Sequence, residues 1–168
     1  SDGDDIIEDE TNLTHFELGR GNDTVDANSG SATYVYNNGD GHDVYIDRGS
    51  DDTDHAVGFR GDLLRFPDLA ETDMVFERSG NDLIITIAEN SATGIEPGSI
   101  VLVGAMERDP YQLEQSIEWI EFSSGVRKPL AEKAQELIAA SASDNADTVV
   151  GTFRADVLEG GEGDDVLR

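Results

Sequence analysis

The chain of 168 residues contains no cysteine. It can therefore form neither a disulfide nor a thiolate metal site, and the sequence leaves its redox compartment open. It also has no apolar run near the ~20 residues that a membrane-spanning helix needs, so we expect no membrane insertion. No secretory signal peptide precedes the first residues, and a repeat pattern is already under way at both ends. We therefore expect a piece of a larger protein.

Basic residues are scarce. Lys and Arg number 11 against 37 Asp and Glu, which gives a net charge of −26 and a pI near 4.1. Nucleic acids and anionic membranes are bound through clustered Lys and Arg, so we expect neither as a partner. Hydrophobic residues make up 37% of the chain. A core can form, although so much like charge opposes the compact state unless something cationic neutralises it.

Common catalytic motifs are also missing. The chain lacks G-x-S-x-G, which presents the serine of many hydrolases, and H-E-x-x-H, which binds zinc in proteases. Paired carboxylates are abundant, but in so acidic a chain they discriminate nothing. We therefore expect no enzyme activity in this chain.

The two acidic residue types are segregated along the chain. Of 22 Asp, 13 lie in residues 1–62 and five in 144–168, whereas ten of the 15 Glu lie between these stretches. Asp favours turns and holds its carboxylate close to the backbone, where hard cations are bound. The two ends are thus predicted to be turn-rich and lined with Asp, and the middle to be an ordinary folded unit.

Three consecutive nonamers begin at residue 142 and read ASDNADTVV, GTFRADVLE and GGEGDDVLR. Each has Asp at position six and an aliphatic residue at position eight, and the last matches G-G-x-G-x-D-x-U-x in full. The candidate metal-site residues of these units are Asp147, Gly151, Asp156, Gly160, Gly161, Gly163 and Asp165.

The N-terminal end repeats this pattern. Its copies are SDGDDIIE at 1–8, LGRGNDTVD at 18–26 and, after a slip of two positions, NGDGHDVYI at 38–46. A degenerate unit keeps only Phe16, and GDLLRF at 61–66 is one more partial copy. The candidate metal-site residues here are Gly3, Asp5, Gly19, Gly21, Asp23, Gly39, Gly41, Asp43 and Asp62.

A coil with two short strands per turn explains the spacing. The first six residues of a nonamer form a turn, and the last three form a strand whose position-eight side chain points inward. Residues two nonamers apart then stack, as Asp5 on Asp23 and Asp147 on Asp165. Stacked carboxylates and turn carbonyls could supply the six to eight oxygens, at about 2.3–2.6 Å, that Ca²⁺ takes, whereas Mg²⁺ tends to keep its waters. Alternatively, each Asp simply caps its own turn and binds nothing.

These repeats resemble the RTX family of secreted bacterial proteins, whose nonapeptides form a parallel β-roll with Ca²⁺ between the turns. The resemblance covers residues 1–47 and 142–168. The middle is similar to the haemolysin-type calcium-binding-related segment, through YVYNNGDGHDVYID, GDLLRF, ERSGNDLIITI and IEWIEFSSG. It departs from that segment by an acidic insertion at 48–61 and by Ser123-Ser124 before Gly125, where the family more often has Ala-Asp.

The predicted fold is mainly β, with parallel β-roll turns at both ends of a β-rich middle segment. A hairpin is expected over 73–88, with further strands at 99–104 and 116–122. One amphipathic helix is expected at 129–140, with Pro129 at its start. The predicted divisions are N-terminal repeats 1–47, middle segment 48–128, capping helix 129–141 and C-terminal repeats 142–168.

The resemblance implies a non-catalytic module of a larger exported protein, such as a toxin, adhesin or exoenzyme, that binds several Ca²⁺ ions and folds on them outside the cell. Extracellular sites bind Ca²⁺ at about 10⁻⁴–10⁻³ M, so they stay empty in the cytosol. Its implied partners are the parent protein's other domains and, during export, the type I secretion machinery. The alternative is a recognition domain for a glycan or surface partner, with the rolls as spacers. An exposed aromatic patch containing Tyr34, Tyr36, Tyr111 or Trp119 would favour that alternative.

Overall fold

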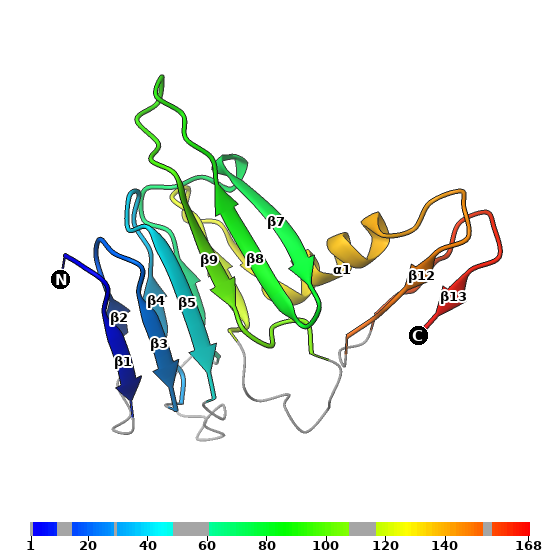
Figure 1. Ribbon diagram of the computed structural model, residues 1–168, viewed down its shortest axis with the longest axis horizontal. Coiled ribbons are helices and arrows are strands. Elements are labelled where there is room, and N and C mark those ends of the chain that lie inside the picture. The colour runs from blue at the N-terminus through cyan, green and yellow to red at the C-terminus, as the bar shows by residue number, and fades with distance from the viewer. Residues whose placement is uncertain (1, 10–14, 29, 49–60, 108–116, 153–155) are drawn as a thin grey trace.

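The computed structural model describes residues 2–9, 15–28, 30–48, 61–107, 117–152 and 156–168, which form a mainly β protein (Figure 1). The larger sheet contains, in spatial order, β1 (Ile6–Asp9), β3 (Thr24–Ala27), β5 (His42–Asp47), β9 (Gly98–Leu102), β8 (Asp82–Ile87) and β7 (Met74–Ser79). The smaller sheet contains β2 (His15–Glu17), β4 (Thr33–Val35), β6 (Leu63–Arg65), β10 (Trp119–Glu121) and β11 (Arg127–Pro129).

From β1 to β6 the chain alternates between these two sheets. Neighbours among β1, β3 and β5 are parallel, and so are neighbours among β2, β4 and β6. Ile6 pairs with Thr24 and His15 with Thr33, so the offset is two nonamers in both sheets. This confirms the predicted stacking of equivalent repeat positions. Between β3 and β5, Thr24 pairs with Val44, and this longer offset matches the slip of two positions in the sequence pattern.

The strands of the middle segment extend both sheets. The hairpin predicted over 73–88 is present as the antiparallel pair β7 and β8. The strands predicted at 99–104 and 116–122 correspond to β9 and β10. β9 pairs in parallel with β5 and antiparallel with β8, so it joins the hairpin to the repeat strands.

A hydrophobic core lies between the two sheets. Position eight of the N-terminal repeats faces it, as the two-residue alternation of strands predicts: Phe16, Val25, Tyr45 and Leu64 are all buried. The rings of Phe16, Tyr34 and Tyr45 stack with centroid distances of 5.1 and 5.4 Å. Because Tyr34 belongs to β4 and Tyr45 to β5, this stack ties the smaller sheet to the larger one.

The predicted helix is present as α1 (Leu130–Ala140), and Pro129 directly precedes it. Leu130, Ala134 and Ile138 form its buried face. The helix contacts β7 and β11, each of which is an edge strand of its sheet. The helix therefore packs against one edge strand of each sheet.

Lys133 is the charged residue on the buried face of α1. Its ammonium lies 2.5 Å from a Glu71 carboxylate oxygen, 2.7 Å from one of Glu136, and 5.0 Å from the centre of the Phe76 ring. These partners compensate for burying the charge, and they fix the helix against β7.

The C-terminal repeats form their own two-stranded parallel sheet, β12 (Thr148–Val149) and β13 (Val166–Leu167). Thr148 pairs with Val166, which again lies two nonamers later. Arg78 of β7 links this two-stranded sheet to the larger sheet, because its guanidinium donates to the carbonyls of Val150 at 2.5 Å and Gly151 at 3.3 Å, directly after β12. Within the described residues, the two repeat blocks therefore share no sheet (Figure 1).

Two expectations for the C-terminal repeats are wrong. Leu167, at position eight, is 47% exposed, and no strand forms at 157–159 in the middle nonamer. A parallel strand needs a neighbour, and the positions two nonamers before 157–159 lie at the end of α1 and just beyond it. A two-stranded pair also cannot enclose a core of its own, so Leu167 stays exposed, although its counterpart Val149 is buried.

Candidate cation site at the repeat turns

The turns that precede β1, β3 and β5 stack at one end of the larger sheet. The amide of Gly3 donates to the carbonyl of Arg20 at 2.6 Å, and the amide of Gly21 donates to the carbonyl of Asp40 at 2.8 Å. These bonds hold the predicted turn residues of successive coils in register, one above another.

Close stacking explains why glycines occupy these turns. A Cβ on Gly21 would lie 2.6 Å from the carbonyl oxygen of Gly3, and a Cβ on Gly41 would collide with the carbonyl oxygen of Gly21. Gly41 also has a φ of +110°, and Gly19 and Gly39 have φ of +88° and +87°, values that other residues rarely adopt. Side chains here would push the coils apart.

The position-six carboxylates of Asp23, Asp43 and Asp165 each accept a hydrogen bond from a backbone amide of the coil before. The amide of Asp5 donates to Asp23 Oδ1 at 2.7 Å, and the amide of Asp23 donates to Asp43 Oδ1 at 3.1 Å. In the C-terminal repeats, the amide of Asp147 donates to Asp165 Oδ1 at 3.0 Å. The predicted stacks of Asp5 with Asp23 and of Asp147 with Asp165 are thus present.

Asp23 differs from the other carboxylates of this row. Its side chain is 1% exposed, and its Oδ2 is buried with no hydrogen-bond partner among the described residues. A buried carboxylate without full compensation costs several kcal/mol in real proteins (~3–5 kcal/mol when a partner is removed). Among the described residues, this is the one buried side-chain oxygen without a hydrogen-bond partner, which makes it the candidate atom for binding a cation.

Asp43 is equally buried, but both of its carboxylate oxygens accept hydrogen bonds. The hydroxyl of Tyr45 donates to Oδ2 at 3.0 Å, beside the Asp23 amide on Oδ1. Burial, aided by the negative charges of Asp23 and Asp40, raises the pKa of Asp43 to about 7. Burial also raises the pKa of Asp40. Negative charge is thus poorly accommodated at this end of the strands.

Two C-terminal carboxylates also close their own turns. The amide and hydroxyl of Ser143 both donate to Asp147 Oδ2 at 2.7 Å, and the amide of Thr152 donates to Asp156 Oδ2 at 2.5 Å. This is the simple turn-capping role that the sequence left open.

The four predicted C-terminal glycines likewise have no room for a Cβ. Gly151 and Gly160 lie against the position-six carboxylates of their own units, and Gly161 and Gly163 lie against the backbone of the coil before.

Asp62 belongs to a second row, in the turns that precede the smaller sheet's strands. The amide of Ala32 donates to Asp62 Oδ1 at 2.5 Å, and the amide of Asp62 donates to Glu118 Oε2 at 2.6 Å. The hydroxyl of Tyr34 donates to Asp47 Oδ2 at 2.9 Å. Burial, and then the charge of Asp47, raises the pKa of Asp62 to about 9.

Sequence reasoning missed Asp47 and Glu118 in this row. Glu118 directly precedes β10 as Asp62 directly precedes β6, and these strands are neighbours. That position before a strand was the only available signal. Glu118 and Asp62 lie 56 positions apart in the sequence, so a search for nine-residue spacing does not connect them.

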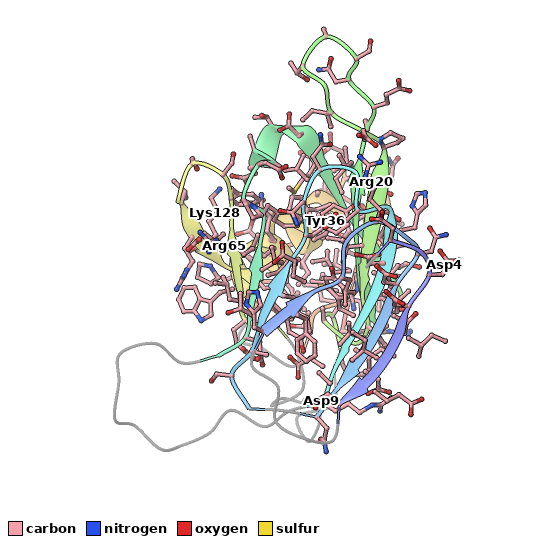
Figure 2. The ribbon with its side chains drawn as sticks, turned by 90° about the vertical axis from the view of Figure 1, so that its left-hand side faces the viewer. Asp4, Asp9, Arg20, Tyr36, Arg65 and Lys128 are labelled. Carbon is pink, nitrogen blue, oxygen red and sulfur yellow. The ribbon has the colours of Figure 1, made fainter. Side chains whose placement is uncertain are left out.

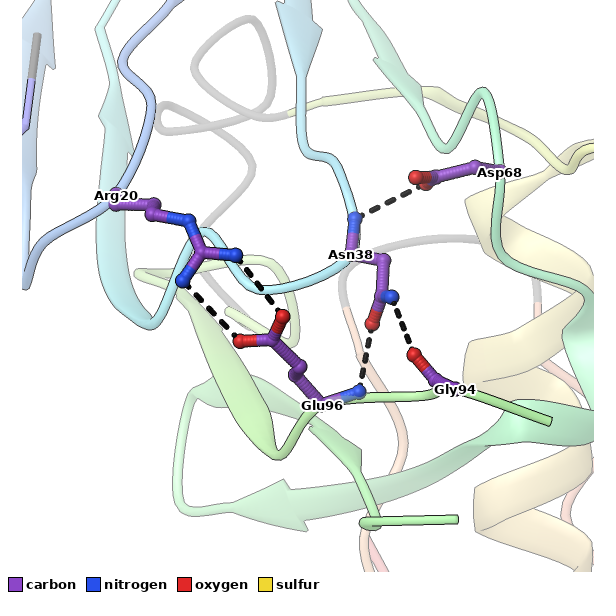
Figure 3. Close-up of polar contacts among 5 residues, drawn as sticks. All are labelled: Arg20, Asn38, Asp68, Gly94 and Glu96. Atoms are coloured by element: carbon purple, nitrogen blue, oxygen red, sulfur yellow. Dashed lines mark hydrogen bonds and ion pairs between the residues drawn. The ribbon is translucent and has the colours of Figure 1, made fainter. Parts of the chain in front are cut away.

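A group of polar contacts that the nonamer pattern does not predict links the repeat turns to the loop before β9 (Figure 3). Arg20 forms an ion pair with Glu96 at 2.9 Å, and the amide of Glu96 donates to the Asn38 side chain at 2.8 Å. The Asn38 side chain also donates to the carbonyl of Gly94 at 2.8 Å, and its backbone amide donates to Asp68 at 3.0 Å. The loop before β9 is thereby fastened to the second and third turns.

Buried negative charge far exceeds buried positive charge. Figure 2 shows Asp4 and Asp9 at opposite ends of β1, and Asp9 is the buried one of the two. Among the described residues, the buried charged side chains are Asp9, Asp23, Asp40, Asp43, Asp47, Asp62 and Lys133. Lys133 is occupied at α1, so it cannot compensate the carboxylates at the strand ends.

The donor atoms at the turns are hard oxygens, which suit Ca²⁺ and not a metal that prefers sulfur or imidazole. No three Asp, Glu or His side chains of the described residues come together as a ready metal centre. A cation at Asp23 would therefore also need oxygens from backbone carbonyls or water. With that addition, the unpartnered Oδ2 fits a Ca²⁺ ligand.

The aromatic residues considered for a recognition patch lie mostly inside the protein. Tyr34 and Tyr36 are buried at 0% and 1% exposure, and Trp119 is half-buried, less than expected for a core residue. Tyr111 lies outside the described residues.

Comparison with protein-family models and with curated proteins found no match to this chain. Among the described residues, no helix has the length and apolar character that crossing a bilayer requires.

Proposed function

We propose that this chain is a non-catalytic Ca²⁺-binding module that completes its folding on Ca²⁺. The observation that carries the proposal is the buried carboxylate of Asp23, whose Oδ2 has no hydrogen-bond partner among the described residues. A divalent cation next to this oxygen supplies the missing charge compensation. Binding energy at such a site becomes folding energy, because the unfolded chain does not preform the site.

We propose a parallel β-roll as the architecture of the N-terminal repeats. Three features support it. Strands β1 to β6 alternate between two sheets, and neighbours among them within each sheet are parallel. The offset is two nonamers between β1 and β3 and between β2 and β4, and it is longer between β3 and β5 and between β4 and β6. In such a coil the turns lie in two rows, one at each end of the strands.

Asp23 is the side chain proposed to hold the ion, with Asp5 of the coil before it as a second carboxylate. Backbone carbonyls of the glycine turns complete the oxygen set. The candidate metal-site residues of the C-terminal turns, and Asp165 above all, are proposed to bind further ions. Ca²⁺ supplies positive charge and no reaction, since the chain carries none of the catalytic motifs sought.

Charge and compartment agree with this role. Each Ca²⁺ removes two of the 26 net negative charges, and so reduces the self-repulsion that opposes the compact state. Sites that fill at about 10⁻⁴–10⁻³ M are empty in the cytosol and occupied outside the cell. We therefore propose a secreted location. Export as an unfolded chain by type I secretion machinery and attachment to further domains rest on the RTX resemblance alone.

Glycan or surface recognition is the weaker proposal. It requires exposed aromatic rings, whereas Tyr34 and Tyr36 are buried in the core. No contact or surface of the described residues favours it specifically.

Isothermal titration calorimetry with Ca²⁺, and with Mg²⁺ as the control ion, tests the proposal. Asp23→Asn keeps the oxygen that accepts from the Asp5 amide but removes the charge, so we expect it to lose one bound Ca²⁺. Asp26→Asn is the matched control on the strand that follows, β3, because Asp26 binds the exposed Arg48 instead. Equal binding by both variants would contradict a site at Asp23.

A further inference from the structure

Asp23 and Asp43 are equivalent residues of consecutive coils, with one difference. Both occupy position six, both are 1% exposed, and both accept an amide from the preceding coil through Oδ1. The Oδ2 of Asp43 also accepts the Tyr45 hydroxyl at 3.0 Å, whereas the Oδ2 of Asp23 has no partner among the described residues.

The difference arises from position eight of each unit. Side chains two residues apart on a strand share a face, so the residue at position eight lies beside the carboxylate at position six. Position eight is Val25 in the second coil and Tyr45 in the third, and the two are register partners. Valine has no polar atom, whereas the tyrosine reaches back to Asp43 with its hydroxyl.

We propose that Tyr45 takes at Asp43 the place that a cation takes at Asp23, so that Asp23 binds Ca²⁺ and Asp43 adds no further site. This inference rests on the proposed function and specifies which repeat turns are cation-dependent. The phenol donates a hydrogen bond that persists without Ca²⁺, and the third coil therefore needs no ion to form.

The neighbouring carbonyl is satisfied in the same way. The carbonyl oxygen of Gly41 accepts the hydroxyl of Tyr36 at 2.7 Å and the amide of Ser99 at 2.9 Å. With two hydrogen bonds its lone pairs are occupied. The register partner of Asp43 on β9 is Ile100, so the row of position-six carboxylates ends here. A coil built this way can serve as the metal-independent base on which the first two coils are ordered by Ca²⁺.

Tyr45→Phe tests the inference, because it keeps the ring in the core and leaves Asp43 Oδ2 without its donor. We expect the variant to bind one Ca²⁺ more than the wild type in calorimetry, and to melt at a lower temperature in EGTA. Tyr36→Phe is the matched control: it removes a buried hydroxyl without touching Asp43, and we expect no added ion.

Asp43→Asn keeps the test decisive if Tyr45→Phe fails to fold. The substitution retains an acceptor oxygen, and we expect an unchanged number of bound Ca²⁺ ions, whereas Asp23→Asn loses one. The inference is overturned if Tyr45→Phe binds no additional ion, or if Asp43→Asn loses one. A wild type that binds no Ca²⁺ at all would instead refute the proposed function.

Discussion

Replacing Asp23 with asparagine should change stability in opposite directions with and without Ca²⁺. In the structure Asp23 is 1% exposed, and one of its carboxylate oxygens has no hydrogen-bond partner among the described residues. In EGTA no Ca²⁺ is available to compensate its charge. Such a charge costs several kcal/mol, whereas an unsatisfied neutral amide costs about 1–3 kcal/mol. The Asp23→Asn variant should therefore be more stable than the wild type in EGTA by about 2 kcal/mol, the difference between these two costs.

With saturating Ca²⁺ the order should reverse. A ligand that binds only the folded state stabilises it by about 2.7 kcal/mol at 100 times its Kd, and the variant loses this contribution from one site. For a chain of this size, 1 kcal/mol corresponds to a shift in melting temperature of about 2–4 °C. Thermal melts in EGTA and in saturating Ca²⁺ measure both differences. A variant that is less stable than the wild type in both buffers would refute the reasoning, because simple loss of packing behaves that way.

Three further outcomes follow from the structure. In EGTA, the free energy of unfolding measured with urea should fall as the pH rises from about 5 to 9. Asp43 and Asp62 have folded pKa values near 7 and 9, above the ~3.9 of the unfolded chain, so the folded protein loses their protons over this range. A free energy of unfolding that rises with pH would contradict this. Gly41→Ala should abolish folding, measured by circular dichroism with or without Ca²⁺, because its Cβ would meet the backbone of the preceding coil. Gly80→Ala should cost only about 1–2 kcal/mol, because Gly80 has a φ of +64° but open space where its Cβ would lie. Similar losses of stability for both variants would count against close stacking. Lys133→Ala should lower the free energy of unfolding by about 1–3 kcal/mol both in EGTA and in Ca²⁺, since it removes a largely buried ammonium from two carboxylates and an aromatic ring. A loss that depends on Ca²⁺ would contradict this and would show that α1 is coupled to the metal sites.

The local part of the fold could be predicted from the sequence. Nine-residue spacing places Asp5 below Asp23 and Thr148 beside Val166, because the offset between stacked coils is a property of the repeat itself. The pattern of apolar strand residues also predicted the hairpin of β7 and β8, and the helical spacing of apolar residues after Pro129 predicted α1. These elements depend on contacts within one unit or between adjacent units.

The remaining part depends on contacts between distant residues. Glu118 continues the row of Asp62 from 56 residues away, and Arg20 meets Glu96 across 76 residues. Both partners follow interruptions of the repeat, so no fixed spacing connects them. The exposure of Leu167 was missed for a similar reason, since whether a position-eight side chain is buried depends on the second sheet opposite it.

The sequence pattern also could not show the difference between Asp23 and Asp43. Both match the repeat, and the pattern treats Val25 and Tyr45 as the same large apolar residue. Only the contact between the Tyr45 hydroxyl and Asp43 separates them.

Far-UV circular dichroism of the wild-type chain, titrated with Ca²⁺ from EGTA to ~10 mM and with Mg²⁺ in parallel, tests Ca²⁺-dependent folding most directly. We predict a cooperative gain of β signal with Ca²⁺ and none with Mg²⁺. A spectrum already complete in EGTA and unchanged by Ca²⁺ would contradict the proposal, and the repeats would then be simple stacked turns.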